Sequence, residues 1–458
     1  RAEVHQIIRE ISAATGSDVT VADDLAAAVA RTEKELGALT VAVNSAGIAN
    51  ATSLNFSTAA ADGSVSIGAG YAVANDSSTG VLVTSAGDFN GDGLDDFVVN
   101  VGGTSANNVY LVYGNTSGTA PSLAGGTIAA SQGFKITTGA NRISVSGAGD
   151  FNGDGLSDLI LGTNGNTFVI YGNSKQIPSG FDLTLSTATL AASEGLKIAG
   201  SGYLVSGAGD VNGDGLTDLI TGDSAGNIKV IYGAASGVTP SVTGFNITAQ
   251  TAVDTLARYS VSSAGDVNGD GLADMIVGSY GQNKAYVIYG NTSSGQTVNV
   301  STGAPAAGAG FTISYASNGT SAGPENLAYQ VSSAGDVNGD GYADLLVGSG
   351  VAASGYTSSA YVVFGGAVGS NVSITAGSAI NNGFVIAAPT GVWSTSYLTS
   401  AGDVNGDGLN DIIMSGTFGS NPGSTYVIYG KTTTTTVNIS TGTIASSLGF
   451  KVTGPATG

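Results

Sequence analysis

Residues 263–274 read Ser263-Ala264-Gly265-Asp266-Val267-Asn268-Gly269-Asp270-Gly271-Leu272-Ala273-Asp274. Acidic, amide and glycine residues are packed into the middle of this stretch, and apolar segments flank it. The pattern predicts a strand that runs into a tight, oxygen-rich loop and out into a second strand. The loop pattern Asp-x-Asn-Gly-Asp-Gly-x-x-Asp occurs six times, beginning at Asp88, Asp150, Asp210, Asp266, Asp336 and Asp403.

The spacing of these loops predicts the fold class. Successive first Asp residues are 62, 60, 56, 70 and 67 residues apart, and four strand-like segments recur in each unit. In the fourth unit they are residues 260–263, 274–278, 285–290 and 310–313. Short β-branched and aromatic runs between glycine-rich turns are typical of strands. Four strands per unit predict an all-β β-propeller of four-stranded blades, whereas the rungs of a β-solenoid are far shorter and a sandwich array does not suit one loop per four strands.

The repeats also divide the chain into segments. Six recognisable units run from 85–136 through 397–452, and the segment from Leu54 to Ile67 resembles the connector and outer strand that end the other units. The propeller can therefore close with six blades, or have seven blades with one incomplete. We expect residues 51–458 to form it. Residues 1–50 differ, with helical apolar spacing in 3–12 and 23–36, and predict a short α-helical N-terminal segment.

Each loop offers oxygen atoms at five of its nine positions. Side chains at positions 1, 3, 5 and 9 and the backbone carbonyl at position 7 form a donor set without His or Cys, which selects Ca²⁺ over transition metals. Glycines at positions 4 and 6 allow the positive φ needed to wrap around an ion. An EF-hand would need flanking helices and Glu at position 12, so we predict a loop inside a β-hairpin and up to six Ca²⁺ ions. The predicted ligands are Asp88, Asn90, Asp92, Leu94, Asp96, Asp150, Asn152, Asp154, Leu156, Asp158, Asp210, Asn212, Asp214, Leu216, Asp218, Asp266, Asn268, Asp270, Leu272, Asp274, Asp336, Asn338, Asp340, Tyr342, Asp344, Asp403, Asn405, Asp407, Leu409 and Asp411.

Composition limits the classes of partner. The 13 Lys and Arg against 33 Asp and Glu give a formal charge of −20, which excludes a basic surface for nucleic acid. Three Asp in each loop account for much of that acidity, and six Ca²⁺ ions would reduce the charge to about −8, an ordinary value for a soluble protein. Cys is absent, and no apolar run has membrane-spanning length. We expect an extracellular or cell-surface bacterial protein without membrane insertion; the chain begins at Arg1 without a visible signal peptide, so we expect a fragment or processed product.

The repeated strands and loops carry a family resemblance. Gly-Phe-x-Ile, Val-Ser-Ser-Ala-Gly-Asp-Val-Asn-Gly-Asp-Gly-x-x-Asp and Tyr-Val-Ile-Tyr-Gly together resemble the FG-GAP repeat of integrin α-chain propellers and their bacterial relatives. The resemblance covers about 400 of the 458 residues. It implies a propeller of usually seven blades, Ca²⁺ in the hairpin loops, and adhesion or recognition at a surface. In integrins only some blades carry the loop, whereas all six repeats carry it here.

A second, shorter resemblance lies within residues 18–48. Asp18-Val19-Thr20, the helical stretch, a strand and Asn44-Ser45-Ala46-Gly47-Ile48 resemble the middle of a short-chain dehydrogenase/reductase. The glycine-rich dinucleotide turn that should open that fold is missing, and half of such a domain cannot bind a dinucleotide. The favoured interpretation is a helical leader or a remnant of an α/β domain.

We expect the chain to act as a calcium-binding extracellular propeller in cell adhesion or in surface recognition of a protein or glycan ligand. The alternative is a non-catalytic structural propeller segment of a larger secreted protein or enzyme. No enzymatic site is predicted, because the single His is His5, outside the repeats, and glutamates outside the loops are few. No catalytic or cofactor-binding residue other than the metal ligands is predicted.

Overall fold

A computed structural model describes residues 58–59, 65–66 and, with short gaps, 81–453. By its contacts the chain divides into two compact units, Arg1–Thr40 and Val41–Gly458. The predicted helical segment and the stretch that resembles a dehydrogenase lie outside the described residues. Everything below concerns the second unit.

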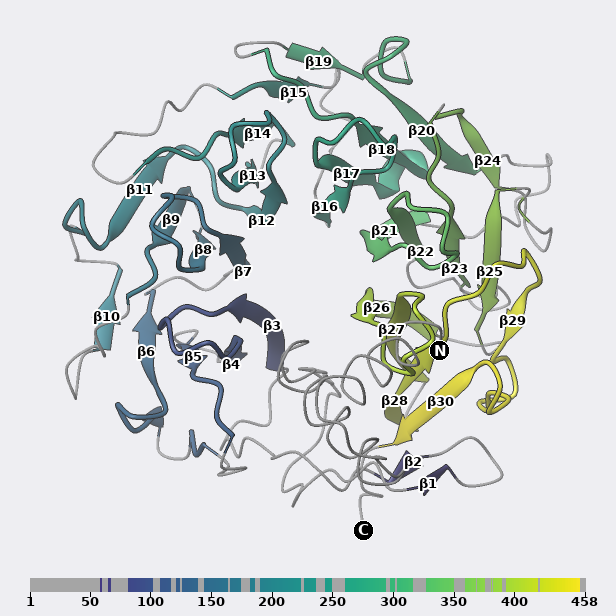
Figure 1. The fold of residues 1–458 in the computed structure, drawn as a ribbon, viewed down its shortest axis with the longest axis horizontal. Helices are drawn as coiled ribbons and strands as arrows, with labels where there is room; N and C mark the ends of the chain where they lie inside the picture. The colour runs from purple at the N-terminus through teal and green to yellow at the C-terminus, as the bar shows by residue number, and fades with distance from the viewer. Residues whose placement is uncertain are drawn as a thin grey trace, which may run out of the picture. The chain divides into compact units, whose positions relative to one another are not determined.

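The described strands form six antiparallel four-stranded blades, which confirms the predicted propeller (Figure 1). Blade 1 holds β3 (Val81–Gly87), β4 (Asp96–Val101), β5 (Asn108–Val112) and β6 (Gly133–Thr137), and blade 2 holds β7 (Ser144–Gly149), β8 (Asp158–Thr163), β9 (Asn166–Ile170) and β11 (Gly195–Ala199). Blade 3 holds β12 (Leu204–Gly209), β13 (Asp218–Gly222), β14 (Ile228–Ile231) and β15 (Asn246–Thr248), and blade 4 holds β16 (Val261–Gly265), β17 (Asp274–Ser279), β18 (Lys284–Ile288) and β20 (Gly310–Tyr315). Blade 5 holds β21 (Leu327–Gly335), β22 (Asp344–Ser349), β23 (Ser359–Val363) and β25 (Gly383–Ala387), and blade 6 holds β26 (Trp393–Gly402), β27 (Asp411–Phe418), β28 (Asn421–Ile428) and β30 (Gly449–Thr453).

Four blades gain a fifth strand that the sequence did not predict. β10 (Asp182–Thr184), β19 (Thr297–Asn299), β24 (Val372–Ile374) and β29 (Val437–Asn438) each lie between the third and fourth strands of their own unit. Each pairs in parallel with the outer strand of the preceding blade. The connector of one unit therefore covers the exposed edge of its neighbour, where unpaired backbone groups would otherwise face water.

Two short strands precede the blades. β1 (Thr58–Ala59) pairs with β2 (Val65–Ser66), and β2 contacts β30 of blade 6. Both lie in the segment predicted to resemble a connector and outer strand. The one helical turn among the described elements is η2 (Tyr280–Gln282), a 3₁₀ turn.

The core lies between the faces of successive blades. Every residue of β17 is buried, and residues 275–277 at its centre are all apolar, as expected for a strand covered on both faces. Its alternate side chains face opposite ways: Ile276 belongs to the core cluster that contains Leu345 of blade 5, whereas Met275 belongs to the cluster that contains Ile220 of blade 3. The first strands β3, β7, β12, β16, β21 and β26 contact one another in that order. This packing fixes the hairpin loops that follow those strands in one repeated orientation.

Candidate metal centre

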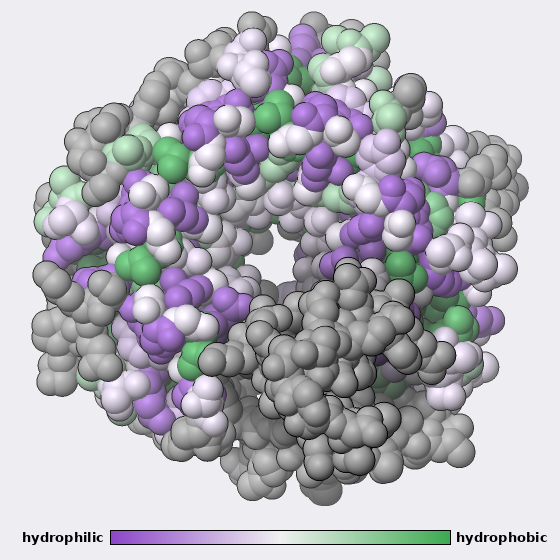
Figure 2. All heavy atoms as spheres, viewed as in Figure 1, coloured by the Kyte–Doolittle hydropathy of each residue, from purple (hydrophilic) through white to green (hydrophobic). Residues whose placement is uncertain are grey.

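Each predicted loop joins the first and second strands of a blade, which confirms the expected hairpin and its strand flanks. In blade 4 the register of β16 and β17 shifts between Ser263 and Gly265, because the chain turns out of the ladder there. Gly269 and Gly271 have φ values of 77° and 86°, as predicted for positions 4 and 6. Figure 2 shows hydrophilic side chains gathered in separate clusters over the inner strands of successive blades.

Positions 1, 3 and 5 are brought together by hydrogen bonds within the loop. In blade 4, Asp266 Oδ1 accepts the N–H groups of Gly269 and Asp270, and its Oδ2 accepts that of Gly271 at 2.9 Å. Asn268 donates from Nδ2 to Asp270 Oδ2 at 2.9 Å, and Asp270 Oδ1 accepts the N–H of Leu272. In all six loops, the position 1 carboxylate accepts the N–H groups of positions 5 and 6, and the Asn at position 3 donates from Nδ2 to the Asp at position 5. Side-chain oxygens therefore face inward on the loop backbone.

Position 9 lies at the base of the loop and differs from the others. Asp274 has no exposed surface, whereas Asp270 is exposed. Its Oδ2 accepts the N–H of Val267 and its Oδ1 accepts the N–H of Gly290, both at 2.8 Å. The equivalent Asp is fully buried in every blade: Asp96, Asp158, Asp218, Asp344 and Asp411.

Burial makes this carboxyl hard to ionise. Desolvation raises the pKa of Asp274 from 3.8 to about 7, the hydrogen bonds from Gly290 and Val267 offset only part of that shift, and the charges of Asp270 and Asp266 add to it. The same leading cause raises the pKa to about 7 in Asp96, Asp158, Asp218 and Asp344, and raises it in Asp411. A buried carboxylate whose partners are neutral amides would be stabilised by a cation.

Sequence reasoning missed one participant, the glycine that ends the third strand segment. Gly290 donates its N–H to Asp274, and a Cβ there would lie 2.7 Å from the Ala273 carbonyl oxygen and 2.9 Å from that of Val211. Equivalent glycines donate to position 9 in every blade: Gly114, Gly172, Gly233, Gly365 and Gly430. The signal was present, because a Tyr-Gly or Phe-Gly pair ends this segment in all six units.

The donor set of each loop fits a hard cation by its chemistry, since carboxylates, an amide oxygen and a carbonyl are what Ca²⁺ prefers. Within the described ranges, no three His, Cys, Asp or Glu side chains converge closely enough to be recognised as a metal cluster. The hydrogen bonds explain this spacing. Asp266 turns toward the amides of residues 269–271, while Asp274 turns toward Val267 and Gly290. Backbone N–H groups therefore lie next to the carboxylate oxygens that would also coordinate an ion.

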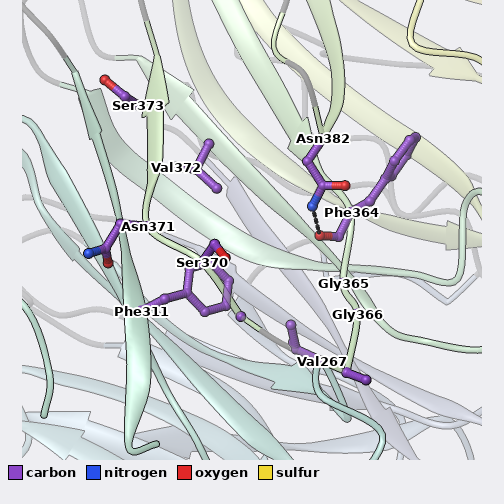
Figure 3. A pocket seen from close by; sticks show the side chains of 12 residues that line it. Val267, Phe311, Phe364, Gly365, Gly366, Ser370, Asn371, Val372, Ser373 and Asn382 are labelled. Carbon is purple, nitrogen blue, oxygen red and sulfur yellow. Dashed lines mark hydrogen bonds between the residues drawn. The ribbon is translucent and has the colours of Figure 1, made fainter. Parts of the chain in front are cut away.

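A cavity of about 640 Å³ lies beside this machinery, between blades 4 and 5 (Figure 3). Val267, at position 2 of loop 4, lines it together with Phe311, Phe364 and Asn382. Asn382 donates from Nδ2 to the Phe364 carbonyl at 2.7 Å, as the dashed line marks. The lining residues include no Asp, Glu, Lys, Arg or His, so the cavity lacks the acid–base groups of hydrolytic catalysis.

The chain resembles known proteins over the same repeats. Residues 88–161, 210–277 and 266–347 match the FG-GAP-like repeat family. Integrin alpha pat-2 of Caenorhabditis briggsae is 28% identical over an alignment of 230 residues, and the match covers 45% of this chain and 18% of that protein. Integrin alpha-V of Gallus gallus is 27% identical over an alignment of 223 residues, and the match covers 45% of this chain and 20% of that protein. The chain thus spans about a fifth of the length of these relatives.

Among solved structures, the WD40 domain of Toxoplasma gondii coronin aligns with 80% of this chain and 69% of its own, with a TM-score of 0.42 and 9% sequence identity.

FG-GAP propellers and integrin α-chains are non-catalytic kinds of domain. In the described ranges, no helix has both the length and the apolar character needed to cross a membrane. Six blades built on one repeated hairpin loop, together with the matches to FG-GAP-like repeats, make this chain an FG-GAP-repeat, integrin-alpha-like β-propeller.

Proposed function

We propose that this chain is a calcium-binding, extracellular or cell-surface propeller that acts in adhesion or in recognition of a protein or glycan ligand. The observation that carries the calcium part is the buried Asp at position 9 of every loop. Its hydrogen-bond partners are uncharged backbone amides, and four further oxygen donors lie in the same loop. A divalent ion would neutralise these carboxylates and hold the hairpin rigid.

The residues that would hold the ion in blade 4 are Asp266, Asn268, Asp270, the carbonyl of Leu272, and Asp274. Asp266 Oδ2, Asp270 Oδ1 and both oxygens of Asp274 each accept one amide hydrogen and keep a second lone pair for a metal, whereas Asp266 Oδ1 accepts two. The ion supplies charge neutralisation and structural order, and it takes part in no reaction. The family match and the integrin relatives support this role. The lining of the cavity between blades 4 and 5 offers no acid–base side chain that would favour a catalytic role instead.

Calcium binding is tested by titration calorimetry together with thermal unfolding in Ca²⁺ and in chelator. We expect several ions to bind and the melting temperature to fall strongly in chelator, because each site at a hundredfold excess over its Kd adds about 2.7 kcal/mol. Asp270→Asn should remove one site. Asp223→Asn is the matched control, since Asp223 lies outside the loops in a turn with Asn227. Unfolding curves that coincide with and without chelator would contradict the proposal.

Recognition is supported by the variable segments between strands, such as 315–326 and 351–359, which are rich in Ser, Gly, Asn and Tyr. Such side chains suit contacts with glycans and proteins. The test is binding of the calcium-loaded chain to glycan arrays and to extracellular-matrix proteins, repeated in chelator. Binding that disappears with the metal supports recognition by the folded propeller.

The second candidate is a structural segment of a larger secreted protein. The short share of the integrin relatives that the chain covers favours its being one part of a longer architecture. A chain that binds calcium but neither glycan nor matrix protein would favour this candidate.

A further inference from the structure

The loops of successive blades are joined to each other by backbone hydrogen bonds. The carbonyl of Asp210, position 1 of loop 3, accepts the N–H of Ala273 in loop 4 at 2.9 Å. The carbonyl of Val211, position 2, accepts the N–H of Asn291 in blade 4 at 2.7 Å. The same two bonds join each of the four remaining pairs of consecutive blades, from N–H donor to carbonyl acceptor: Ser157 to Asp88, Asn173 to Phe89, Thr217 to Asp150, Ala234 to Phe151, Ala343 to Asp266, Gly366 to Val267, Asn410 to Asp336 and Lys431 to Val337.

These bonds continue through the buried carboxylates. Asn291 directly follows Gly290, whose N–H is bound to Asp274 Oδ1, while Asp274 Oδ2 holds the N–H of Val267. The Val267 carbonyl in turn accepts the N–H of Gly366 in blade 5, at 2.8 Å. The N–H and C=O of Val267 belong to adjacent peptide units joined through one Cα, as do the N–H groups of Gly290 and Asn291, so a chain of hydrogen bonds linked by these short stretches of backbone runs from loop 1 to loop 6. We call it the lateral chain.

Side-chain contacts leave little freedom between the loops. A Cβ on Gly213, at position 4 of loop 3, would lie 3.0 Å from Cδ2 of Leu272, at position 7 of loop 4. A Cβ on Gly209, just before loop 3, would lie 2.6 Å from Cβ of Ala273. One loop therefore packs directly on the next, and a shift in either displaces the other.

We propose that the six loops form one cooperative unit, in which ordering of one loop favours ordering of its neighbours through the lateral chain. That Ca²⁺ is the ion that orders the loops rests on the proposed function. The coupling itself depends only on the backbone hydrogen bonds between the loops. The physical reason is that a fixed loop presents the carbonyls of its positions 1 and 2 to the next blade in bonding geometry, so the neighbouring loop loses less conformational freedom when it becomes ordered. Coupling between two sites is reciprocal, so each loop affects both neighbours.

Ala234→Pro tests the coupling without changing a proposed ligand. Proline removes the N–H that Ala234 donates to Phe151 in blade 2, and the preceding residue, Gly233, tolerates the restriction that proline imposes. Ala234→Asn is the matched control, because blades 2 and 4 carry Asn173 and Asn291 at this place. We expect wild type to bind Ca²⁺ with a Hill coefficient above one, and Ala234→Pro to bind less steeply, with affinity lowered about 5- to 150-fold at the adjoining loops. Ala234→Asn should titrate as wild type.

A second experiment needs no metal. Asp210→Ala removes the acceptor for Asp214 and Gly215 and loosens loop 3 in the metal-free chain. Hydrogen exchange, followed by mass spectrometry, should then become faster in loops 2 and 4 as well as in loop 3, and stay unchanged in loop 6. Asp223→Ala in the same blade is the control and should leave all loops protected.

The outcomes separate this inference from the proposed function. Calcium uptake with a Hill coefficient of one, or Ala234→Pro titrating like wild type, overturns the coupling and leaves the calcium function standing. Lack of calcium uptake by wild type overturns the calcium function, and hydrogen exchange then decides the coupling. The same experiment decides if Ala234→Pro does not fold. In both situations, faster exchange confined to loop 3 of Asp210→Ala overturns the coupling.

Discussion

The inner and outer parts of the blades are joined to their neighbours in different ways. At the inner loops, every consecutive pair is joined by the same two backbone bonds between equivalent residues. At the outer edge, neighbours meet through short parallel pairings, of three residues between β15 and β19 and two between β25 and β29. The loops have nine residues in every unit, whereas the units differ in total length through the segments that join their other strands.

This difference indicates where the repeat tolerates change. A loop of constant length can bond to its neighbour only if each glycine, amide and carboxylate keeps its place. A connector that adds two or three backbone bonds to an outer strand can lengthen elsewhere at little cost. We therefore expect perturbations of the inner loops to outweigh those of the outer edge, and the following experiments order them by size.

Acidification of the metal-free chain should have the largest effect, because it acts on six loops at once. Burial raises the folded-state pKa of Asp274 to about 7, above the 3.8 of the unfolded chain, and five other loops share the direction of shift. The folded chain then binds more protons, so this stability is present at low pH and is lost as pH rises through about 7. The melting temperature of the metal-free chain should be higher at pH 5.5 than at pH 8 by several degrees. A lower value at pH 5.5 would show that these carboxyls are not buried as described.

Truncation of one buried carboxylate comes next. Asp274→Ala leaves the N–H groups of Val267 and Gly290 without their acceptor, at a cost of about 1–3 kcal/mol for each buried donor. Asp270→Ala, at the exposed position 5 of the same loop, should cost below about 1 kcal/mol without metal. Denaturant unfolding of the two metal-free variants measures the difference. Equal losses would mean that the base and the tip of the loop contribute alike.

A methyl group at the strand end should cost less. Gly290→Ala directs a Cβ at the carbonyl oxygens of Ala273 and Val211 and should destabilise by about 1–3 kcal/mol. Gly281→Ala, in the same blade, has nothing within 4 Å of the added Cβ and serves as the matched control. If both variants unfold at the same denaturant concentration, the close approach of loops 3 and 4 at Gly290 is wrong.

The smallest effect is expected at the outer edge. Asn371 Oδ1 accepts the N–H of Thr312 in blade 4 at 2.8 Å, from an exposed position next to β24. Asn371→Ala should cost about 0.5–1.5 kcal/mol. Thr297→Ala, exposed in β19, should be neutral within about 0.5 kcal/mol. A loss at Asn371 larger than at Asp274 would reverse the proposed order of inner and outer contributions.

The sequence predicted the blades well because their signals are local. The segment 274–278 became β17 (Asp274–Ser279), and 310–313 became β20 (Gly310–Tyr315), since β-branched runs between glycines report strands directly. The loop positions were likewise visible in the spacing of Asp266, Asn268, Asp270 and Asp274. The six blades formed by the described strands agree with one of the two numbers expected, while the metal ligands stay predictions.

What the sequence could not supply is contact between units. β19 has only three residues, and its partner β15 lies in another blade, so no period within Thr297–Asn299 reveals the pairing. The difference between Asp270 and Asp274 was also hidden, because both are Asp in one motif and only packing decides which is buried. Gly290 was noted as a strand end, but its bond to Asp274 depends on the hairpin and third strand meeting in space.

Within the lateral chain, position 8 of each loop is bonded to position 1 of the preceding loop, as Ala273 is to Asp210. An internal tandem duplication that inserts one whole unit, from one loop to the next, would therefore recreate every donor and acceptor at its new junctions. A deletion of one unit would do the same. A deletion that cuts into a loop would leave its neighbour without a donor or an acceptor, so lineages of such chains should differ by whole loops while the segments between the loops vary in length.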